Sequence, residues 1–475
     1  MGKTSITFIA DTHHYSRTLG DSGKAFVFRS DSDQKCLKET GAIIDSAFDY
    51  LGKSDCDAVC IAGDLTNDGE KVCHEEFREK LYRLRENKKV YVVTATHDWC
   101  CDKNPRRFSG DDVYNDVPTL DHNEIYDFYK NFGVNDAFAE YKTTLGPASY
   151  TVNIGENITL LGLIDDKNGR NSAGYKSAHL DWICEQIKLA IKNGKVPIAM
   201  EHHLLIPHIT PLFTKGACSP DREKIINSFA DAGLKIIIVG HSHLQRIDKH
   251  VSPLGNEIYE INVGSLVGYP APMVTVTADE NKISVKTEYL KEFTFDGETL
   301  DAQKYLANHS ANVISVLFSA AAQNDGELFR QRLTALGINT EKLGKAFTPL
   351  FLFFKKLSNM TVSEAGEYIN KIPFAKKIPQ ESINAYSSFT VQQITEKVFL
   401  NILDGAREKY PSDTHFYKVV AGVFSVPVSI CKRMKITGKP LELFTELYRA
   451  IDEILTGGEL SNESLTVSRI TYKTK

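Results

Sequence analysis

The sequence predicts a layered α/β domain followed by a mostly helical domain. Short β-rich segments alternate with helical patterns over roughly the first 290 residues, which is the pattern of sheets covered by helices. After about residue 295 the strand signals nearly vanish, while helical patterns continue. A chain of 475 residues is long enough for several domains. We therefore expect one domain at 1–295 and a helical domain at 296–475.

The expected strands are rich in β-branched and aromatic residues, and many end at Gly, Asp or His. They cover residues 5–10, 58–62, 90–95, 150–154, 159–164, 197–200, 235–239, 257–263, 274–277 and 283–288. Between them, apolar side chains recur at helical spacing, as at Leu180, Ile183 and Ile187.

In the second part of the chain, two helix starts are marked by a hydroxyl residue followed three positions later by Glu or Gln. Thr361 with Glu364 and Thr390 with Gln393 have this spacing, which is that of a capping box. We expect a helix to begin after each threonine.

Composition excludes several classes of protein. The chain carries 56 Lys and Arg against 61 Asp and Glu, and a net charge of −5 disfavours nucleic-acid binding through bulk positive charge. No apolar run approaches the ~20 residues of a membrane helix, and the first residues leave no room for a signal peptide. Nine cysteines without a CxxC pair predict free thiols in a reducing compartment, hence a cytoplasmic protein.

Five of the expected strands run directly into residues that can bind metal ions. Ligands gather at the carboxyl ends of strands in α/β sheets, so these strand ends predict one shared site. The five segments are Asp11-Thr12-His13, Gly63-Asp64, His97-Asp98, His202-His203 and Gly240-His241-Ser242-His243.

The spacing within these segments agrees with a metal site. Asp11 and His13 are two residues apart, as are His241 and His243, and residues at this spacing in an extended chain face the same side. His202 and the next residue should face opposite sides, so at most one of them is a ligand. Mixed Asp and His ligands without Cys suit Mn, Fe or Zn, and an Asp can bridge two such ions.

These motifs, in this order, resemble the calcineurin-like metallophosphoesterase superfamily over roughly residues 1–290. The run AGDLTNDGE at 62–70 is similar to the cyclic-nucleotide and glycerophosphodiester phosphodiesterase branch. The resemblance implies a four-layer αββα sandwich, here followed by the helical domain. It also implies metal-dependent hydrolysis of a small phosphate ester, with a diester ahead of a monoester.

The resemblance further implies a role for each motif residue. Two metal ions, with a hydroxide between them that attacks phosphorus, would share Asp64 as a bridging ligand. The first ion would be held by Asp11, His13, Asp64 and His243, and the second by Asp64, His202 and His241. His97 would protonate the leaving oxygen, and Asp98 would orient His97.

One position departs from the family pattern. The family usually has Asn where this chain has Thr96, and the Asn supplies a carbonyl oxygen to the second metal. A neutral threonine hydroxyl is a poor ligand for a divalent ion. We therefore expect Thr96 to make a weak contact at most, and the second site to bind its metal less tightly or to prefer a different metal.

Several alternatives stay open at this stage. Asn67 and Asp68 belong either to the pocket or to the turn before the next helix. Of His14 and His203, one lines the pocket and the other is solvated. Asp165 and Asp166 lie either at the site edge or in a solvated loop. A phosphate- or nucleotide-binding sensor without activity competes with the enzyme, and a nuclease is a third possibility. We expect no membrane partner, and the chain could form a homo-oligomer.

Overall fold

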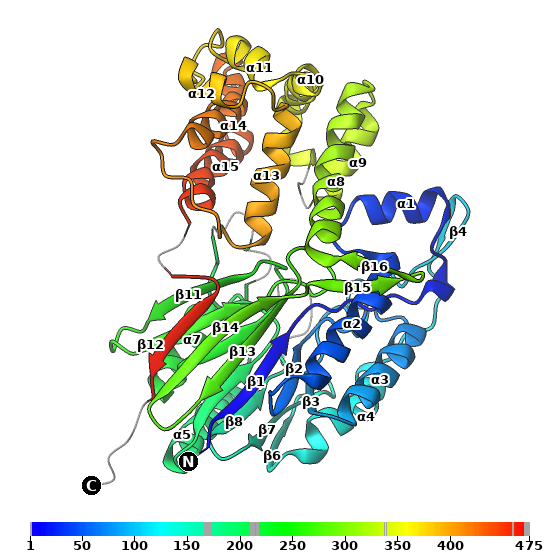
Figure 1. Cartoon of the computed structure of the whole chain (residues 1–475), viewed down its shortest axis with the longest axis vertical. Helices are drawn as coiled ribbons and strands as arrows, with labels where there is room; N and C mark the ends of the chain where they lie inside the picture. The colour runs from blue at the N-terminus through cyan, green and yellow to red at the C-terminus, as the bar shows by residue number, and fades with distance from the viewer. Residues whose placement is uncertain are drawn as a thin grey trace.

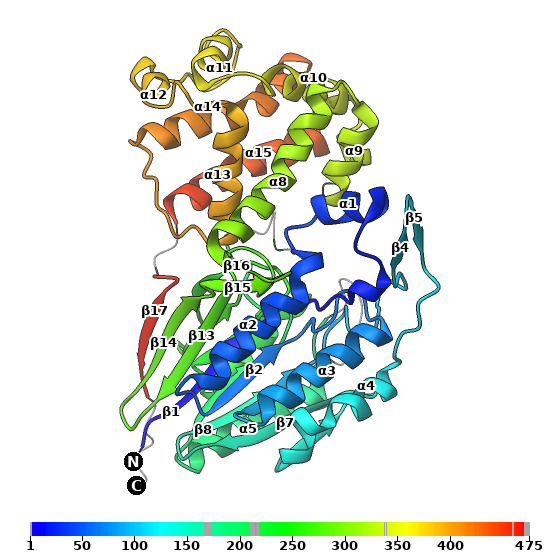
Figure 2. The same ribbon diagram turned by 45° about the vertical axis from the view of Figure 1, so that its right-hand side comes forward.

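The computed structural model describes residues 2–165, 173–209, 214, 218–336, 338, 340–457 and 460–469. Two β-sheets pack face to face, helices cover the outer face of each, and a helical region stands at one end of the sheets (Figures 1 and 2). This arrangement confirms the predicted αββα sandwich with a helical C-terminal region.

The first sheet has the strand order β17-β14-β13-β1-β2-β3. Strands β1, β2 and β3 run parallel, whereas β13, β14 and β17 are each antiparallel to their neighbours. The bounds are β1 Thr4–Ile9, β2 Ala58–Ala62, β3 Lys89–Val93, β13 Pro272–Ala278, β14 Lys282–Tyr289 and β17 Ser464–Ser468.

The second sheet has the order β11-β12-β10-β9-β8-β7-β6. Its central strands β8, β9, β10 and β12 are parallel, and the outer pairs are antiparallel. The bounds are β6 Ala139–Lys142, β7 Ala148–Ile154, β8 Ile158–Gly162, β9 Val196–Met200, β10 Ile236–Val239, β11 Arg246–Val251 and β12 Glu257–Asn262.

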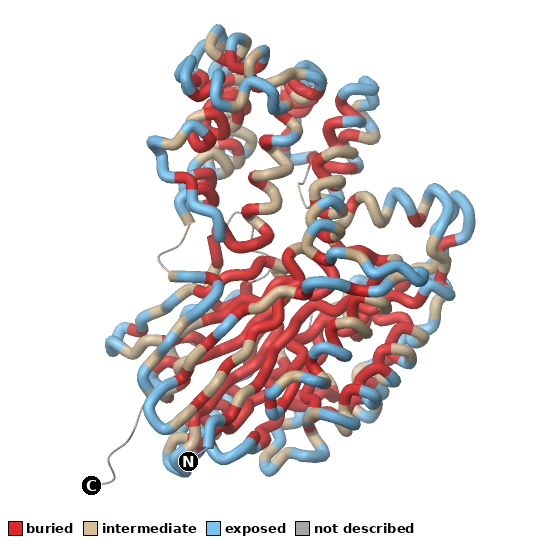
Figure 3. The backbone as a smooth tube through the Cα atoms, viewed as in Figure 1, coloured by how far each residue is buried: buried red, intermediate tan, exposed pale blue. Residues whose placement is uncertain are grey.

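Three apolar layers hold the sandwich together, and the strands are buried along much of their length (Figure 3). Between the sheets, side chains such as Ile6, Phe8, Ile198 and Ile238 are fully buried. Outside the first sheet lie α2 (Thr40–Lys53), α3 (Lys71–Arg85) and α4 (His122–Tyr129). Outside the second sheet lie α5 (Ser177–Lys192) and α7 (Arg222–Ala232). Successive strand residues alternate between the two faces, so strands buried on both sides are apolar throughout.

The C-terminal helices form their own apolar clusters. Their bounds are α8 Ala302–Ala322, α9 Gly326–Ala335, α10 Phe347–Leu357, α11 Val362–Ile369, α12 Gln380–Ala385, α13 Val391–Leu403, α14 His415–Arg433 and α15 Lys439–Thr456. Both predicted capping boxes are confirmed, at the starts of α11 and α13.

The helical region and the sandwich are joined at two places along the chain. The hairpin of β15 (Glu292–Phe295) and β16 (Glu298–Asp301) crosses the expected boundary at residue 295 and leads into α8. After α15 the chain returns to the sandwich, where β17 pairs with β14 (Figure 1). This last strand was not expected in the helical part.

The strands that sequence reasoning missed in the two main sheets are β6, β11 and β17. All three are edge strands, and all expose alternate residues to solvent. Edge strands carry charged and polar side chains, so they lack the apolar signal that reveals an inner strand. Two small elements near the site, β4 (Arg107–Ser109) and β5 (Asp112–Tyr114), form a separate hairpin.

Among the described residues, no helix is both long and apolar enough to span a membrane. All nine cysteines are free thiols, as predicted.

Candidate metal centre

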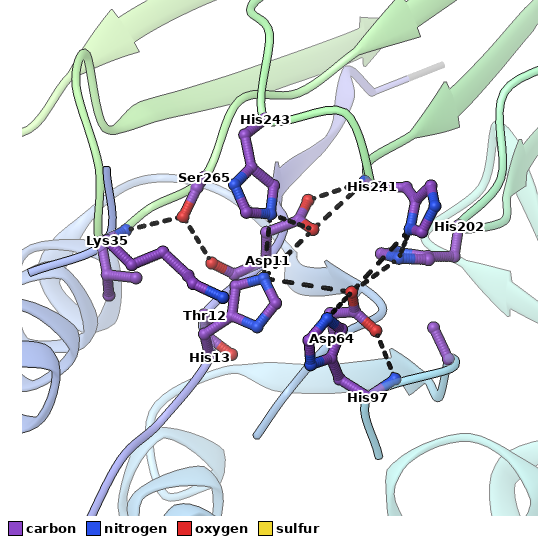
Figure 4. A network of polar contacts seen from close by, with 12 residues as sticks. Asp11, Thr12, His13, Lys35, Asp64, His97, His202, His241, His243 and Ser265 are labelled. Atoms are coloured by element: carbon purple, nitrogen blue, oxygen red, sulfur yellow. Dashed lines mark hydrogen bonds and ion pairs between the residues drawn. The ribbon is translucent and has the colours of Figure 1, made fainter. Parts of the chain in front are cut away.

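The loops that follow β1, β2, β3, β9 and β10 meet at one end of the sandwich (Figure 4). Backbone hydrogen bonds join the first two loops: the Asp11 amide donates to the Gly63 carbonyl at 3.2 Å, and the His13 amide donates to the Asp64 carbonyl at 3.0 Å. Because the strands are fixed by the sheets, their ends bring the predicted residues together from distant parts of the chain.

Five of the six expected ligands have an unusual backbone conformation. Asp11, His13, Asp64, His241 and His243 all have positive φ, between 38° and 67°. This left-handed region is uncommon for residues other than glycine and is found at sites where the surrounding fold imposes it. These left-handed residues direct the side chains of the loops after β1, β2 and β10 toward a common centre.

One group of three side chains lies on the β1 and β10 side of the site. The Nε2 atoms of His13 and His243 are 3.0 Å apart. Asp11 Oδ1 lies 3.3 Å from His243 Nε2 and 3.6 Å from His13 Nε2. These atoms are close enough to bind a single ion.

A second group lies beside it, around Asp64. Asp64 Oδ2 is 3.0 Å from His202 Nε2, 3.9 Å from His13 Nε2 and 4.0 Å from His241 Nδ1. The His202 and His241 rings approach to 3.0 Å through the same nitrogen atoms. Asp64 therefore stands between the two groups, where a bridging ligand would lie.

The donor set fits metal ions. Asp11, His13 and Asp64 are 0% exposed and His202 is 3% exposed, so their polar atoms have little access to water. Burial and the nearby charge of Lys35 lower the pKa of His13 to about 3, and burial together with His203 lowers the pKa of His241 well below its usual value. Both rings are therefore neutral, as a ligand must be. Burial opposes protonation of His202, but Asp64 raises its pKa to about 10, so a cation is favoured beside Asp64.

Neighbouring groups orient these ligands. His202 Nδ1 donates to the Ala62 carbonyl at 2.8 Å, which leaves Nε2 free to face Asp64. The Asp11 carboxylate accepts from the His241 amide at 3.0 Å, and the Ser265 hydroxyl donates to the Asp11 carbonyl at 2.8 Å.

Gly63 is required by the close approach of two loops. Its φ is +84°, and a Cβ atom at this position would lie 2.5 Å from His202 Nδ1. Glycine is therefore the residue that lets His202 reach Asp64.

His97 lies on the open side of the centre. Its Nε2 is 4.0 Å from Asp64 Oδ2, and its side chain is 28% exposed. Its Nδ1 contacts the Asn67 carbonyl and lies 3.4 Å from Asp68 Oδ1. Burial opposes protonation of His97, but the charges of Asp64 and Asp68 raise its pKa above the usual value. Asp68 is in turn held by Arg106, whose Nε donates to Asp68 Oδ2 at 2.8 Å.

The expected role of Asp98 needs correction. Its carboxylate accepts hydrogen bonds from the backbone amides of Leu65, Thr66 and Ala95 at 2.8–3.0 Å and from the Thr66 hydroxyl at 3.1 Å. These bonds tie the loop after β2 to the loop after β3, and none of the hydrogen bonds described for Asp98 reaches the His97 ring. Asp68, not Asp98, is the carboxylate that orients His97.

The remaining expected residues also lie near the centre. Thr96 is 7% exposed, and its contact with a second metal stays a prediction. The side-chain Nδ2 of Asn67 donates to Asp68 Oδ2 at 2.9 Å. His203 Nδ1 lies 2.5 Å from Asp165 Oδ2, and its ring centre is 4.7 Å from that of His241, so His203 packs against the site. Asp166 is outside the described residues.

His14 lies away from the centre. Its Nε2 is 2.8 Å from Glu76 Oε2, and its ring packs near Phe77 of α3. Burial lowers its pKa.

The model of the family described as calcineurin-like phosphoesterase matches residues 4–245, about half of the chain. The chain belongs to this family.

Solved structures to which the chain is similar include a dimetal phosphatase from Danio rerio, at 11% identity and a TM-score of 0.43, with 63% of this chain and 99% of that chain covered. A purple acid phosphatase from yellow lupin (Lupinus luteus) has 12% identity and a TM-score of 0.38, with 63% and 53% covered. A 5′-nucleotidase precursor from Thermus thermophilus has 12% identity and a TM-score of 0.33, with 66% and 60% covered. No curated protein matches the chain.

As a calcineurin-like phosphoesterase, the protein is a metal-dependent hydrolase of phosphate esters, and the clusters around Asp11 and Asp64 are its candidate metal sites.

Sequence reasoning missed two charged residues of this phosphoesterase's site. Arg106 holds Asp68, which positions His97, and Lys35 lies beside His13 (Figure 4). For Asp68 the sequence leaves both the pocket and the turn before the next helix open, because its direction depends on the turn after β2. Lys35 and Arg106 belong to loops without any motif, so no local signal marks them.

Proposed function

We propose that this phosphoesterase hydrolyses a phosphodiester at a two-metal centre. The observation that carries the proposal is the position of Asp64, whose Oδ2 lies within 4.0 Å of nitrogen atoms from His13, His97, His202 and His241. One carboxylate between two sets of imidazole nitrogens is the arrangement that a pair of ions needs.

The ligands divide into two sets under this proposal. The first ion would be held by Asp11, His13, Asp64 and His243, and the second by Asp64, His202 and His241. Mn, Fe and Zn suit these donors. When bound, the ions supply Lewis-acid stabilisation of the phosphoryl oxygens and lower the pKa of water.

His97 supplies the proton for the leaving oxygen. The Asn67 carbonyl can only accept a hydrogen bond, so Nδ1 of His97 carries a hydrogen and Nε2 faces the centre. Despite burial, the charges of Asp64 and Asp68 raise the pKa of His97, which favours the protonated ring that a general acid requires. Asp68 and Arg106 hold the ring in this orientation while the proton moves to the substrate.

The preference for a diester comes from the similarity of the 62–70 run to the cyclic-nucleotide and glycerophosphodiester phosphodiesterase branch. The substrate would be a small phosphate ester rather than a nucleic acid, because the chain has a net charge of −5. We further propose that the protein acts in the cytoplasm, where its nine thiols would stay reduced.

A sensor that binds phosphate or a nucleotide without turnover is the second candidate. Thr96 favours it, because the second ion has lost an amide ligand relative to the family pattern. The site retains an oriented His97, which a binding protein would not need.

The test is hydrolysis of a chromogenic phosphodiester and a chromogenic phosphomonoester by metal-stripped protein, with Mn, Fe, Zn or Mg added back. Asp64→Ala serves as the control. We expect metal-dependent turnover that the control lacks, with the diester hydrolysed faster. A faster monoester would reverse the substrate preference. Measured metal binding without turnover of either ester would favour the sensor.

A further inference from the structure

A buried lysine lies beside the first group of ligands and has no part in the mechanism described above. Lys35 is 4% exposed, and its side chain extends toward the segment of Asp11, Thr12 and His13, with its amine beside His13 (Figure 4). Its charge acts on both His13 and His97. A buried ammonium is costly unless a partner of opposite charge is near, so its position calls for an explanation.

The carboxylate nearest to Lys35 is shared with another cation. Asp33 Oδ2 lies 3.4 Å from Lys35 Nζ but only 2.5 Å from Arg29 Nη1. The Lys35 amide also donates to Asp33 Oδ1 at 3.1 Å. On this wall of the site, the Asp33 carboxylate therefore faces two cations, Arg29 and Lys35.

The C-terminal helices hold this wall in place. His309 Nε2 of α8 lies 3.1 Å from the carbonyl oxygens of both Asp33 and Lys35. Asn312, also of α8, donates to Asp31 Oδ1 at 3.0 Å. Arg332 of α9 donates to the Ser32 hydroxyl at 2.6 Å. The segment that carries Lys35 is thus braced by long-range contacts, as a preorganised binding group requires.

Charge complementarity indicates what the wall would bind. Two divalent ions, as in the proposed function, would outweigh the two carboxylates Asp11 and Asp64, and Lys35 would add positive charge on the side of His13. A low-dielectric site with such an excess favours a phosphoryl group over neutral or cationic ligands.

We propose that Lys35 is a substrate-binding residue that donates a hydrogen bond to a phosphoryl oxyanion beside the first metal site. This inference rests on the proposed function, and it gives the helical region a role, since α8 and α9 hold the lysine against the centre. The oxyanion belongs either to the phosphate that is hydrolysed or to a second phosphate of the substrate.

The test measures binding rather than turnover. Inorganic phosphate and pyrophosphate are titrated by calorimetry into Mn-loaded protein, for the unchanged chain, Lys35→Met and Lys38→Met. Lys38 is a matched control three residues away, with a side chain 35% exposed and paired with Asp21 at 3.6 Å. We expect Lys35→Met to weaken binding about 10- to 100-fold, the range for one hydrogen bond to a charged group. The exposed Lys38 should change it less than about twofold.

The two ligands distinguish the sources of the oxyanion. Weaker binding of both phosphate and pyrophosphate places Lys35 on the hydrolysed phosphate, and weaker binding of pyrophosphate alone places it on a second phosphate. Unchanged binding of both, with an unchanged metal content, would overturn the proposal.

A charge-conserving variant and the hydrolysis assay separate the role of Lys35 from the proposed function. Lys35→Arg keeps the positive charge and should bind phosphate more tightly than Lys35→Met. If Lys35→Arg binds as weakly as Lys35→Met, the result would also count against the proposal. If the unchanged protein binds phosphate or pyrophosphate through Lys35 but hydrolyses no ester, the proposed function fails and the subsite stands. If it hydrolyses esters while Lys35→Met binds both phosphate and pyrophosphate equally well, the subsite fails alone.

Discussion

Replacement of Asp98 by Asn separates a structural from a catalytic role for this carboxylate. Asp98 accepts four hydrogen bonds, three of them from buried backbone amides. In Asp98→Asn, Oδ1 can still accept from Leu65 and Thr66, but the new amide group faces the Ala95 N–H. One buried donor is then left without an acceptor, which costs about 1–3 kcal/mol.

Asp98→Ala removes all acceptors at once. Three backbone amides lose their partner, so the expected loss is roughly 3–9 kcal/mol, comparable with the whole stability of many proteins. We expect Asp98→Ala to fail to fold stably and Asp98→Asn to fold with a lower midpoint of denaturant unfolding, measured at constant pH.

The pH profile of kcat/KM then tests which carboxylate orients His97. A general acid is active when protonated, so activity falls as the pH rises through its pKa. The charge of Asp68 helps to raise the pKa of His97, so Asp68→Asn should move this alkaline fall to lower pH. Asp98→Asn should leave it in place. An unchanged stability together with a shifted alkaline limb in Asp98→Asn would refute the reasoning.

Three further predictions concern the metal centre and its acid. His97→Ala should lower turnover at least ~100-fold without a change in metal content, and equal turnover would exclude its role as the acid. Thr96→Asn should tighten the second metal in a metal titration; identical affinity and stoichiometry in both proteins would mean that Thr96 does not contact that ion. Gly63→Ala should lower the metal content, since its Cβ would lie 2.5 Å from His202 Nδ1, and full occupancy of both sites would contradict this.

Much of the fold was predictable because the inner strands, and also the edge strand β3, are buried and rich in apolar residues. The strands that carry the site, β1, β2, β3, β9 and β10, begin and end within a few residues of the expected positions. The edge strands β6, β11 and β17 were not predictable, because half of each faces solvent and its residues resemble a loop.

The site divides in the same way. The expected ligands were recognisable because each directly follows a buried strand, and strand ends meet at one edge of a sheet. The carboxylate that contacts His97 was not recognisable. Asp98 follows His97 in the sequence, but its side chain turns back toward Leu65 and Ala95. Asp68, which contacts His97, comes from another loop. In a loop, unlike a strand, the position of a residue in the sequence does not predict which way its side chain points.

The sequence by itself determined the strand ends, their Asp and His residues and the family to which they belong, because these depend on local pattern and order along the chain. Only the tertiary structure decided that Asp68 orients His97 and that Lys35 stands beside His13. Lys35 is held by His309, far away in the chain, through contacts with backbone carbonyls. A backbone carbonyl can accept such a contact whatever its side chain is, so the contact leaves no mark in the sequence of the segment that carries Lys35.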